Sequence, residues 1–325
     1  MARNRKFFIN RTVVYISSRI QEGLPFVATP FMRLLLQSYL AGAQERYPVK
    51  IVAFLFMSNH FHLLLVVENP EDVAHFMEYF KRETAIAINR LLGRRQRTVW
   101  ASGYDSPIVL DEAKMIETLV YIYTNPQEAR LVNTIEDYPQ LSTWNEFLSG
   151  TSSTSLIPTF RRDAVPHLSG PSSKKQAKRV YEEILSKSKH SKVLKIEPFA
   201  WLDCFADTIG MSPETVIERV VKQVRAEEAR FQKEHGTKVL GAETLICQDI
   251  RTPYTPKKFG KKMICLADDK FKRIEFLQWY FDQKRRIERA MKDWKEKLIP
   301  PSLPPGFFLP GGKMTASLLP FVFSL

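Results

Sequence analysis

The stretch VKIVAFLFMSNHFHLLLVV (residues 49–67) decides how the N-terminal half of the chain folds. Two apolar runs flank the three residues MSN, and this arrangement predicts two antiparallel strands joined by a tight hairpin. The second run carries His60 and His62 among its apolar residues. Because residues two apart on a strand share a face, both imidazoles point to one side of the sheet and Phe61 points to the other.

The segments around this hairpin predict one α+β unit. Apolar periodicity and helix-start signals predict strands at 12–19, 49–56, 60–67 and within 100–110, and helices at 29–46, 70–93 and 111–125. Pro126 is expected to stop the last helix, because proline lacks the backbone N–H that would continue it. The order β-α-β-β-α-β-α matches the split β-α-β, ferredoxin-like plan with an antiparallel sheet, plus one extra helix.

The composition changes after Gly150, and the change divides the chain. Residues 1–150 are expected to form the first domain, residues 151–180 are rich in Ser, Thr, Pro and Lys and indicate a linker, and residues 181–325 are expected to be mainly helical. Residues 1–150 hold 16 Lys and Arg against 15 Asp and Glu, a net of +1, whereas the remaining residues hold 32 against 20, a net of +12. A basic half attached to a neutral one suggests a polyanion partner, most commonly nucleic acid.

Candidate DNA contacts lie in this basic half, on a predicted helix at 271–298 and in a loop before it. Arginine and lysine bind phosphates, and aromatic rings stack on unpaired bases. The alternative is that the aromatic residues of this helix pack in the core beside a solvated basic face. The candidate contacts are Lys284, Arg285, Arg286 and Arg289 on the helix and Lys257, Lys258, Lys261 and Lys262 in the loop.

Other features of the chain exclude several classes of protein. No apolar run approaches the roughly 20 residues of a membrane span. The three cysteines lie far apart, so neither a zinc knuckle nor a disulfide framework is expected. We therefore expect a protein of the reducing cytoplasm with no membrane partner.

Two motifs carry the candidate chemistry. Two imidazoles on one strand face can converge on a metal ion, although a hard cation also needs an oxygen ligand. In YIYTNP (residues 121–126), Tyr121 and Asn125 are four apart and share one face of the predicted helix. Asn125 offers a carbonyl oxygen to the metal and Tyr121 offers a phenol one turn away. The plainer alternatives are structural histidines and a tyrosine that only packs.

A divalent cation and a phenol together suit phosphate chemistry. The cation polarises a scissile phosphate and neutralises the charge that develops on its oxygens. Attack by a tyrosine on DNA phosphate gives a covalent phosphotyrosine, which stores the bond energy for rejoining.

The motif FMSNHFHLLL, followed about sixty residues later by YIYTNPQEARLV, resembles the REP-associated tyrosine transposases. These belong to the single-tyrosine, insertion-sequence-200-like HUH transposases, and the resemblance covers roughly residues 8–150. It implies a ferredoxin-like nuclease domain that cleaves single-stranded, hairpin-forming DNA with Mg²⁺ or Mn²⁺. By motif position, His60 and His62 match the metal-binding pair, Tyr121 the nucleophile and Asn125 the third ligand.

The chain departs from the family pattern at two positions. Ser58 stands where proline is usual, which affects only the turn. Arg130 stands where a small residue, often glycine, follows the Asn-Pro turn, and this could alter the loop and its DNA contacts.

We therefore expect a metal-dependent endonuclease and strand transferase that acts through a 5′-phosphotyrosine on the hairpin ends of palindromic repeats. The protein is expected to be a monomer or homodimer associated with the bacterial nucleoid. Two alternatives stay open: a domesticated, sequence-specific DNA-binding protein without turnover, and a metal-dependent nuclease that uses water.

Overall fold

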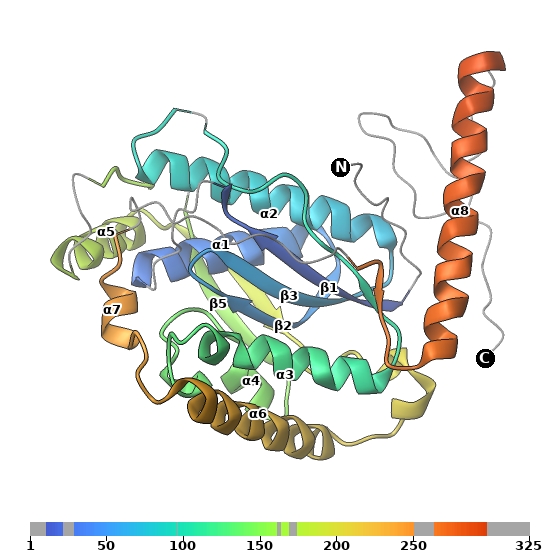
Figure 1. Ribbon diagram of the computed structural model, residues 1–325. Coiled ribbons are helices and arrows are strands. Elements are labelled where there is room, and N and C mark those ends of the chain that lie inside the picture. The colour runs from blue at the N-terminus through green and yellow to red at the C-terminus, as the bar shows by residue number, and fades with distance from the viewer. Residues whose placement is uncertain are drawn as a thin grey trace.

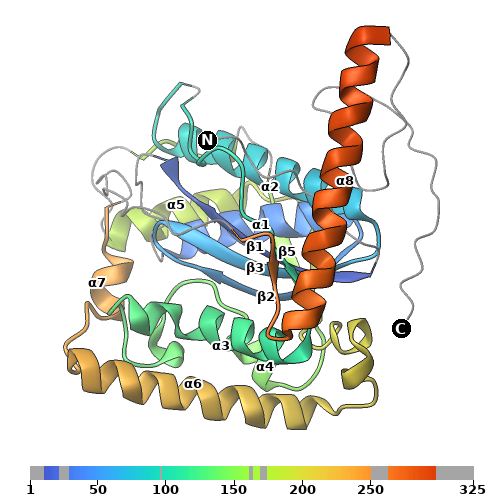
Figure 2. The same cartoon turned by 45° about the vertical axis from the view of Figure 1, so that its right-hand side comes forward.

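The computed structural model describes residues 11–21, 29–95, 97–160, 164–168, 174–249 and 263–297. In these ranges seven strands form one sheet in the order β5-β6-β2-β3-β1-β4-β7, and helices cover both of its faces (Figures 1 and 2). The strands are β1 (Thr12–Arg19), β2 (Val49–Phe56), β3 (His60–Val67), β4 (Ile108–Val109), β5 (Ser153–Thr159), β6 (His190–Ile196) and β7 (Cys265–Leu266).

The four central strands have the ferredoxin-like arrangement that the sequence predicts. Their spatial order is β2-β3-β1-β4, and β1 pairs antiparallel with both β3 and β4 while β2 pairs antiparallel with β3. Helices α1 (Pro30–Arg46) and α2 (Pro70–Leu91) lie on one face of the sheet. Helix α3 (Glu112–Glu128) lies on the other face (Figure 1). The predicted α+β class is therefore confirmed.

Strand β3 is apolar on both sides because both faces of the sheet are covered. Phe61, Leu63 and Leu65 join the core under α1 and α2. Leu64 and Val66 join the core under α3. His62, only 2% exposed, shares the second face with Leu64, so the apolar pattern itself fixes the side to which the histidines point.

Two of these helices, α1 and α3, begin at a residue whose side chain caps the helix. Thr29 caps α1, its hydroxyl accepting from the backbone N–H of Met32. Asp111 caps α3 by accepting from the N–H of Lys114 at 2.8 Å. The second oxygen of Asp111 accepts from the N–H groups of Asp268 and Asp269, which ties the C-terminal half to the start of α3.

The predicted linker at 151–180 is wrong in its first part and in its last, where residues 174–180 already belong to α5 (Lys174–Ser186). Ser153–Thr159 form β5, which pairs with β6 along its whole length, and β6 pairs in parallel with β2. Strand β5 is the edge of the sheet and is mostly exposed, so it tolerates polar residues and a proline that a central strand would not. The C-terminal half therefore adds strands as well as helices, and the division of the chain at residue 150 into independent domains stays a prediction.

The predicted stop of α3 at Pro126 is also wrong, because the helix continues to Glu128. A proline in the last turn removes only one hydrogen bond of the helix. The true end is a Schellman-type turn, in which the N–H of Leu131 bonds to the carbonyl of Pro126 and that of Arg130 to Gln127. Arg130 has φ 55° there, the left-handed conformation that explains why a small residue would be favoured at this position.

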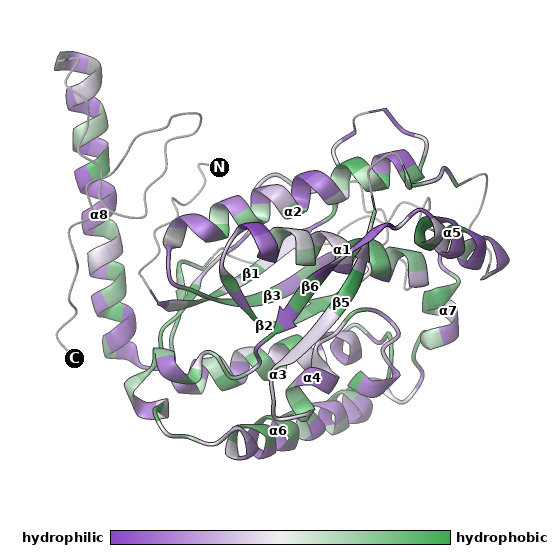
Figure 3. Cartoon of the chain, turned by 180° about the vertical axis from the view of Figure 1, so that it is seen from behind, coloured by the Kyte–Doolittle hydropathy of each residue, from purple (hydrophilic) through white to green (hydrophobic). Residues whose placement is uncertain are grey.

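The remaining helices lie outside this central unit. Helix α6 packs on the outer side of α3, and the long helix α8 extends beyond the sheet (Figures 1 and 2). Hydrophilic residues colour much of α5 and α8, whereas the central strands β2 and β3 are mainly hydrophobic (Figure 3). No helix in the described ranges is long and apolar enough to cross a membrane. These helices are α4 (Trp144–Leu148), α5 (Lys174–Ser186), α6 (Pro213–His235), α7 (Ala242–Ile246) and α8 (Lys270–Lys297).

Candidate active site

The β2–β3 hairpin holds the two histidines at its closed end. The N–H of Met57 bonds to the carbonyl of His60 at 2.8 Å, which closes the turn. Phe61 fixes which side of β3 faces the core under α1 and α2. Its ring is fully buried against Phe80 and Trp100, at centroid distances of 5.7 and 5.3 Å. With Phe61 fixed in the core, the imidazoles on either side of it must face α3.

The two imidazoles converge through their Nε2 atoms. His60 Nε2 and His62 Nε2 are 2.9 Å apart, with the ring planes nearly perpendicular. Each Nδ1 is engaged elsewhere: that of His60 lies 2.5 Å from Asn59 Oδ1 and that of His62 lies 2.5 Å from Tyr15 Oη. A metal-binding histidine is oriented in this way, with one ring nitrogen held by a neighbour and the other directed at the ion.

Burial keeps both imidazoles neutral at pH 7. It lowers the pKa of His60 to about 4, against a smaller opposing effect of the hydrogen bond with Asn125. It lowers the pKa of His62 as well, and the neighbouring His60 adds to that shift. Only a neutral imidazole can donate a lone pair to a metal, so the pair is in the protonation state that ligands require.

This shift predicts that the metal-free protein loses stability in mild acid. The folded pKa of His60 is about 4, below the ordinary value of about 6.5. The unfolded chain therefore takes up the proton first, and stability falls as pH falls from about 6.5 towards 4. At pH 5 His60 should cost about 2 kcal/mol of the free energy of unfolding relative to pH 7. Urea unfolding at the two pH values measures the loss. The variant His60→Asn should lose less, and an equal loss in both proteins would contradict the assignment.

Helix α3 brings Tyr121 and Asn125 to the histidines, as the helical spacing predicts. Tyr121 is 45% exposed with its ring 5.4 Å from that of His62, whereas Tyr123 is fully buried on the opposite side of the helix. The Asn125 side chain hydrogen-bonds with His60, with His62 and with Tyr121. These bonds raise the pKa of both imidazoles and lower that of the phenol. The Asn125 amide therefore lies between the histidine pair and Tyr121.

Strand β1 contributes Tyr15 and Arg19, neither of which belongs to the two sequence motifs. Arg19 pairs with His60 in the β1–β3 register and Ser17 pairs with His62, so Tyr15 is a diagonal neighbour of His62 on the same face. The Tyr15 ring stacks on His62 at 5.8 Å and lies 6.5 Å from Tyr121. Burial raises the pKa of Tyr15, and Tyr121 and Asp105 add to the shift, so Tyr15 stays a neutral phenol.

Helix α6 fixes the end of α3 that carries Asn125. Glu228 of α6 is 4% exposed and accepts hydrogen bonds from Gln127 Nε2 at 2.7 Å and from the N–H of Ile135 at 2.9 Å. Arg225 pairs with the same carboxylate at 2.7 Å, which supplies the charge that a buried glutamate needs. The basic half of the chain thus supports the site through packing, in addition to any contact with DNA.

The predicted DNA contacts on α8 do not belong to this cluster. Lys284, Arg285, Arg286 and Arg289 are on α8, where Asp282 pairs with Arg285 and Arg286. Tyr280 of the same helix is buried, so for this ring the core-packing alternative is correct. The DNA-binding role of α8 stays a prediction. Lys257, Lys258, Lys261 and Lys262 lie outside the described residues.

Residues 26–125 of the chain match the family model described as transposase IS200 like. The matched residues include the histidine pair, Tyr121 and Asn125. This confirms, for the N-terminal part of the chain, the resemblance given by the two motifs, and the class is one of enzymes.

Two individual proteins are similar to this chain. A Haemophilus influenzae protein named as a REP-associated tyrosine transposase is 22% identical over 151 residues, which cover 44% of this chain and 85% of that protein. A solved structure of a REP-associated tyrosine transposase bound to a REP hairpin aligns with a TM-score of 0.41 and 17% identity, over 46% of this chain and 86% of that one.

Proposed function

We propose that the protein cleaves and rejoins single-stranded DNA beside hairpins formed by palindromic repeats, through a covalent 5′-phosphotyrosine on Tyr121. The observation that carries the proposal is the convergence of the two Nε2 atoms, 2.9 Å apart, with Asn125 and Tyr121 hydrogen-bonded to each other beside them. An association with REP sequences is supported by the name of the Haemophilus relative, a REP-associated tyrosine transposase. Such a substrate implies a cytoplasmic, nucleoid-associated enzyme.

Tyr121 carries out the bond exchange in this proposal. Its phenolic oxygen forms a bond to phosphorus while the bond from phosphorus to the 3′ oxygen breaks. The phenol gives up its proton and the released 3′ oxygen takes one up, so the products are a phosphotyrosine and a free 3′ hydroxyl. Burial raises the pKa of Tyr121, and its hydrogen bonds with Asn125 and Tyr15 oppose that shift. Attack by a released 3′ hydroxyl reverses the steps and rejoins the strand.

The residues present fit a divalent cation such as Mg²⁺ or Mn²⁺. In the described ranges no three His, Cys, Asp or Glu side chains gather at one point, and the third protein ligand in this proposal is the amide of Asn125. Two neutral imidazoles and the Asn125 oxygen supply three ligands and leave other positions for water and a phosphate oxygen. A bound cation would polarise the phosphate and neutralise its developing charge. Arg19, beside His60 in the register, offers a further positive charge to the same phosphate.

A hairpin oligonucleotide with flanking single strands tests this proposal. The full-length protein with Mn²⁺ should give a covalent protein–DNA band on denaturing electrophoresis, and a chelator should remove it. Retention of the DNA without a covalent band would favour the binding-only alternative. Cleaved DNA without the band would favour a nuclease that uses water.

Tyr15 is expected to orient His62 for the metal. In Tyr15→Phe, the Nδ1 of His62 loses its 2.5 Å partner, and loss of such an outer partner lowers metal affinity by about 10- to 100-fold. Calorimetric titration with Mn²⁺ measures the affinity without relying on activity. Tyr138→Phe is the matched control, because it removes a buried hydroxyl that donates to the carbonyl of Phe56 without touching a histidine. Equal Mn²⁺ affinity in the two variants would contradict this role.

A further inference from the structure

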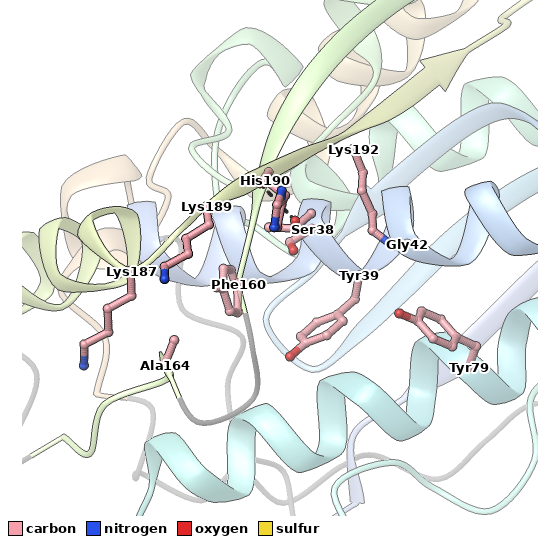
Figure 4. A pocket seen from close by; sticks show the side chains of 11 residues that line it. Ser38, Tyr39, Gly42, Tyr79, Phe160, Ala164, Lys187, Lys189, His190 and Lys192 are labelled. Atoms are coloured by element: carbon pink, nitrogen blue, oxygen red, sulfur yellow. Dashed lines mark hydrogen bonds between the residues drawn. The ribbon is translucent and has the colours of Figure 1, made fainter.

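A pocket lined by lysines and aromatic rings lies between α1, α2, the end of β5 and the start of β6 (Figure 4). Its volume is about 660 Å³, which is in the range of sites that bind small ligands. Tyr39 of α1, Tyr79 of α2 and Phe160 after β5 form its aromatic wall, and Lys187 and Lys189 come from the turn between α5 and β6.

The pocket is separate from the candidate active site. Strand β6 runs parallel to β2 with Ile196 beside Ile51, so its first residue, His190, lies beyond the N-terminal end of β2. His60 lies at the other end of β2, where Phe56 pairs with Phe61. The two sites are therefore on the order of 30 Å apart along the strands. They also open on opposite faces, because the pocket is lined by α1 and α2 and the histidines face α3.

The aromatic wall offers a surface on which a flat ring can stack. The rings of Phe160 and Tyr39 meet edge to face at 5.9 Å, and Phe160 is only partly buried. At Gly42 an added Cβ would lie 2.9 Å from the Tyr79 hydroxyl, so the absence of a side chain there lets Tyr79 approach α1. Partly exposed aromatic rings of this kind stack on bases of any sequence.

The charges around the opening favour an anion. Lys187 pairs with Glu183 at 2.7 Å and Lys192 contacts Glu45. Lys189 has no carboxylate partner among the residues that the structure describes. Three lysines thus face two carboxylates, and one ammonium group is left to bind an anion. A lysine binds phosphate as a point charge, without the fixed geometry that arginine imposes.

We propose that this pocket binds one unpaired nucleotide, with its base against Phe160 and its phosphate against Lys189. The proposal rests on the proposed function, because the single strand that flanks a hairpin is the source of such a nucleotide in the substrate. A free mononucleotide carries the same chemistry and is the other source. Bound DNA would then contact both ends of the sheet, with the hairpin junction at Tyr121 and its flanking strand at the pocket.

The test uses full-length protein and hairpin oligonucleotides with 2-aminopurine at successive positions of the flanking strand. Stacking on Phe160 should quench the fluorescence at one position. Phe160→Leu should relieve the quenching and weaken binding about fivefold or more. Lys189→Gln should flatten the log–log salt dependence of binding by slightly less than one unit. The matched controls are Ile209→Ala, an apolar side chain that is 73% exposed outside α8, and Lys222→Gln on α6.

The outcomes separate this proposal from the proposed function. In one outcome, wild-type protein forms the covalent adduct while both pocket variants show wild-type 2-aminopurine quenching, DNA affinity and salt dependence of binding. In that case the pocket proposal is overturned and the proposed function stands. A titration with a deoxynucleoside monophosphate distinguishes the two sources of ligand. Both Phe160→Leu and Lys189→Gln could weaken binding of the monophosphate while neither changes DNA binding. That result would assign the pocket to a free nucleotide. If the two variants change neither DNA binding nor monophosphate binding, the pocket is not a nucleotide site.

Discussion

Replacement of Tyr121 by phenylalanine is expected to eliminate the covalent adduct completely, because no other atom at that position can form the bond to phosphorus. Metal affinity should be nearly unchanged, since the phenol is not among the three proposed metal ligands. Tyr123→Phe should keep the adduct, because Tyr123 is fully buried and its hydroxyl lies 3.2 Å from Thr143 Oγ1. That variant should instead lose about 1 kcal/mol of stability with its hydrogen bond. Denaturing electrophoresis with a labelled hairpin oligonucleotide and Mn²⁺ measures the adduct in each variant.

An undiminished adduct in Tyr121→Phe would refute the assignment of the nucleophile. Tyr15 is then the phenol to examine, because its hydroxyl lies 2.5 Å from His62 Nδ1 and its ring lies 6.5 Å from that of Tyr121. The double variant Tyr15→Phe/Tyr121→Phe would separate the two phenols. A residual adduct in the double variant would point to a nucleophile outside this cluster.

The central unit and the cluster of histidines with Tyr121 and Asn125 could be predicted from sequence, because each depends on a local spacing of residues along a strand or helix. On β3 the alternation of Phe61 with His60 and His62 fixes the face of the imidazoles once Phe61 is buried. On α3 the four-residue spacing of Tyr121 and Asn125 does the same for a helix. In both cases a neighbouring buried residue, Phe61 or Tyr123, fixes which side of the strand or helix faces the core. No knowledge of the rest of the chain is required.

Features that depend on pairing between distant segments could not be predicted in this way. Tyr15 lies in an apolar strand and looks like a core residue, and only the register of β1 against β3 makes it a neighbour of His62. Strand β5 has the polar composition of a linker because an edge strand is mostly exposed. The nucleotide pocket joins residues from α1 with residues some 150 positions later, and no local pattern marks that meeting.

Removal of one imidazole is the second change for which we expect a large effect. His60→Ala should lower Mn²⁺ affinity by more than about 100-fold, because loss of a direct ligand should exceed the effect of losing an outer partner. Covalent adduct formation should be lost with it. His60 is the better choice than His62, since His62 is 2% exposed and its removal would leave a cavity in the core. The more accessible ring of His60 can be deleted at a smaller cost in stability.

His75→Ala provides the matched control, because His75 lies on α2 and stacks on Tyr47 at 5.6 Å, away from the cluster. Far-ultraviolet circular dichroism and thermal unfolding establish that both variants are folded, and calorimetry with Mn²⁺ then gives their affinities. We expect wild-type affinity and adduct yield in His75→Ala and neither in His60→Ala. If folded His60→Ala still binds Mn²⁺ and forms the adduct, the histidines serve only the packing of β3. The neutral pair that converges beside Asn125 would then have no role in cleavage, and the proposed chemistry would have to be abandoned.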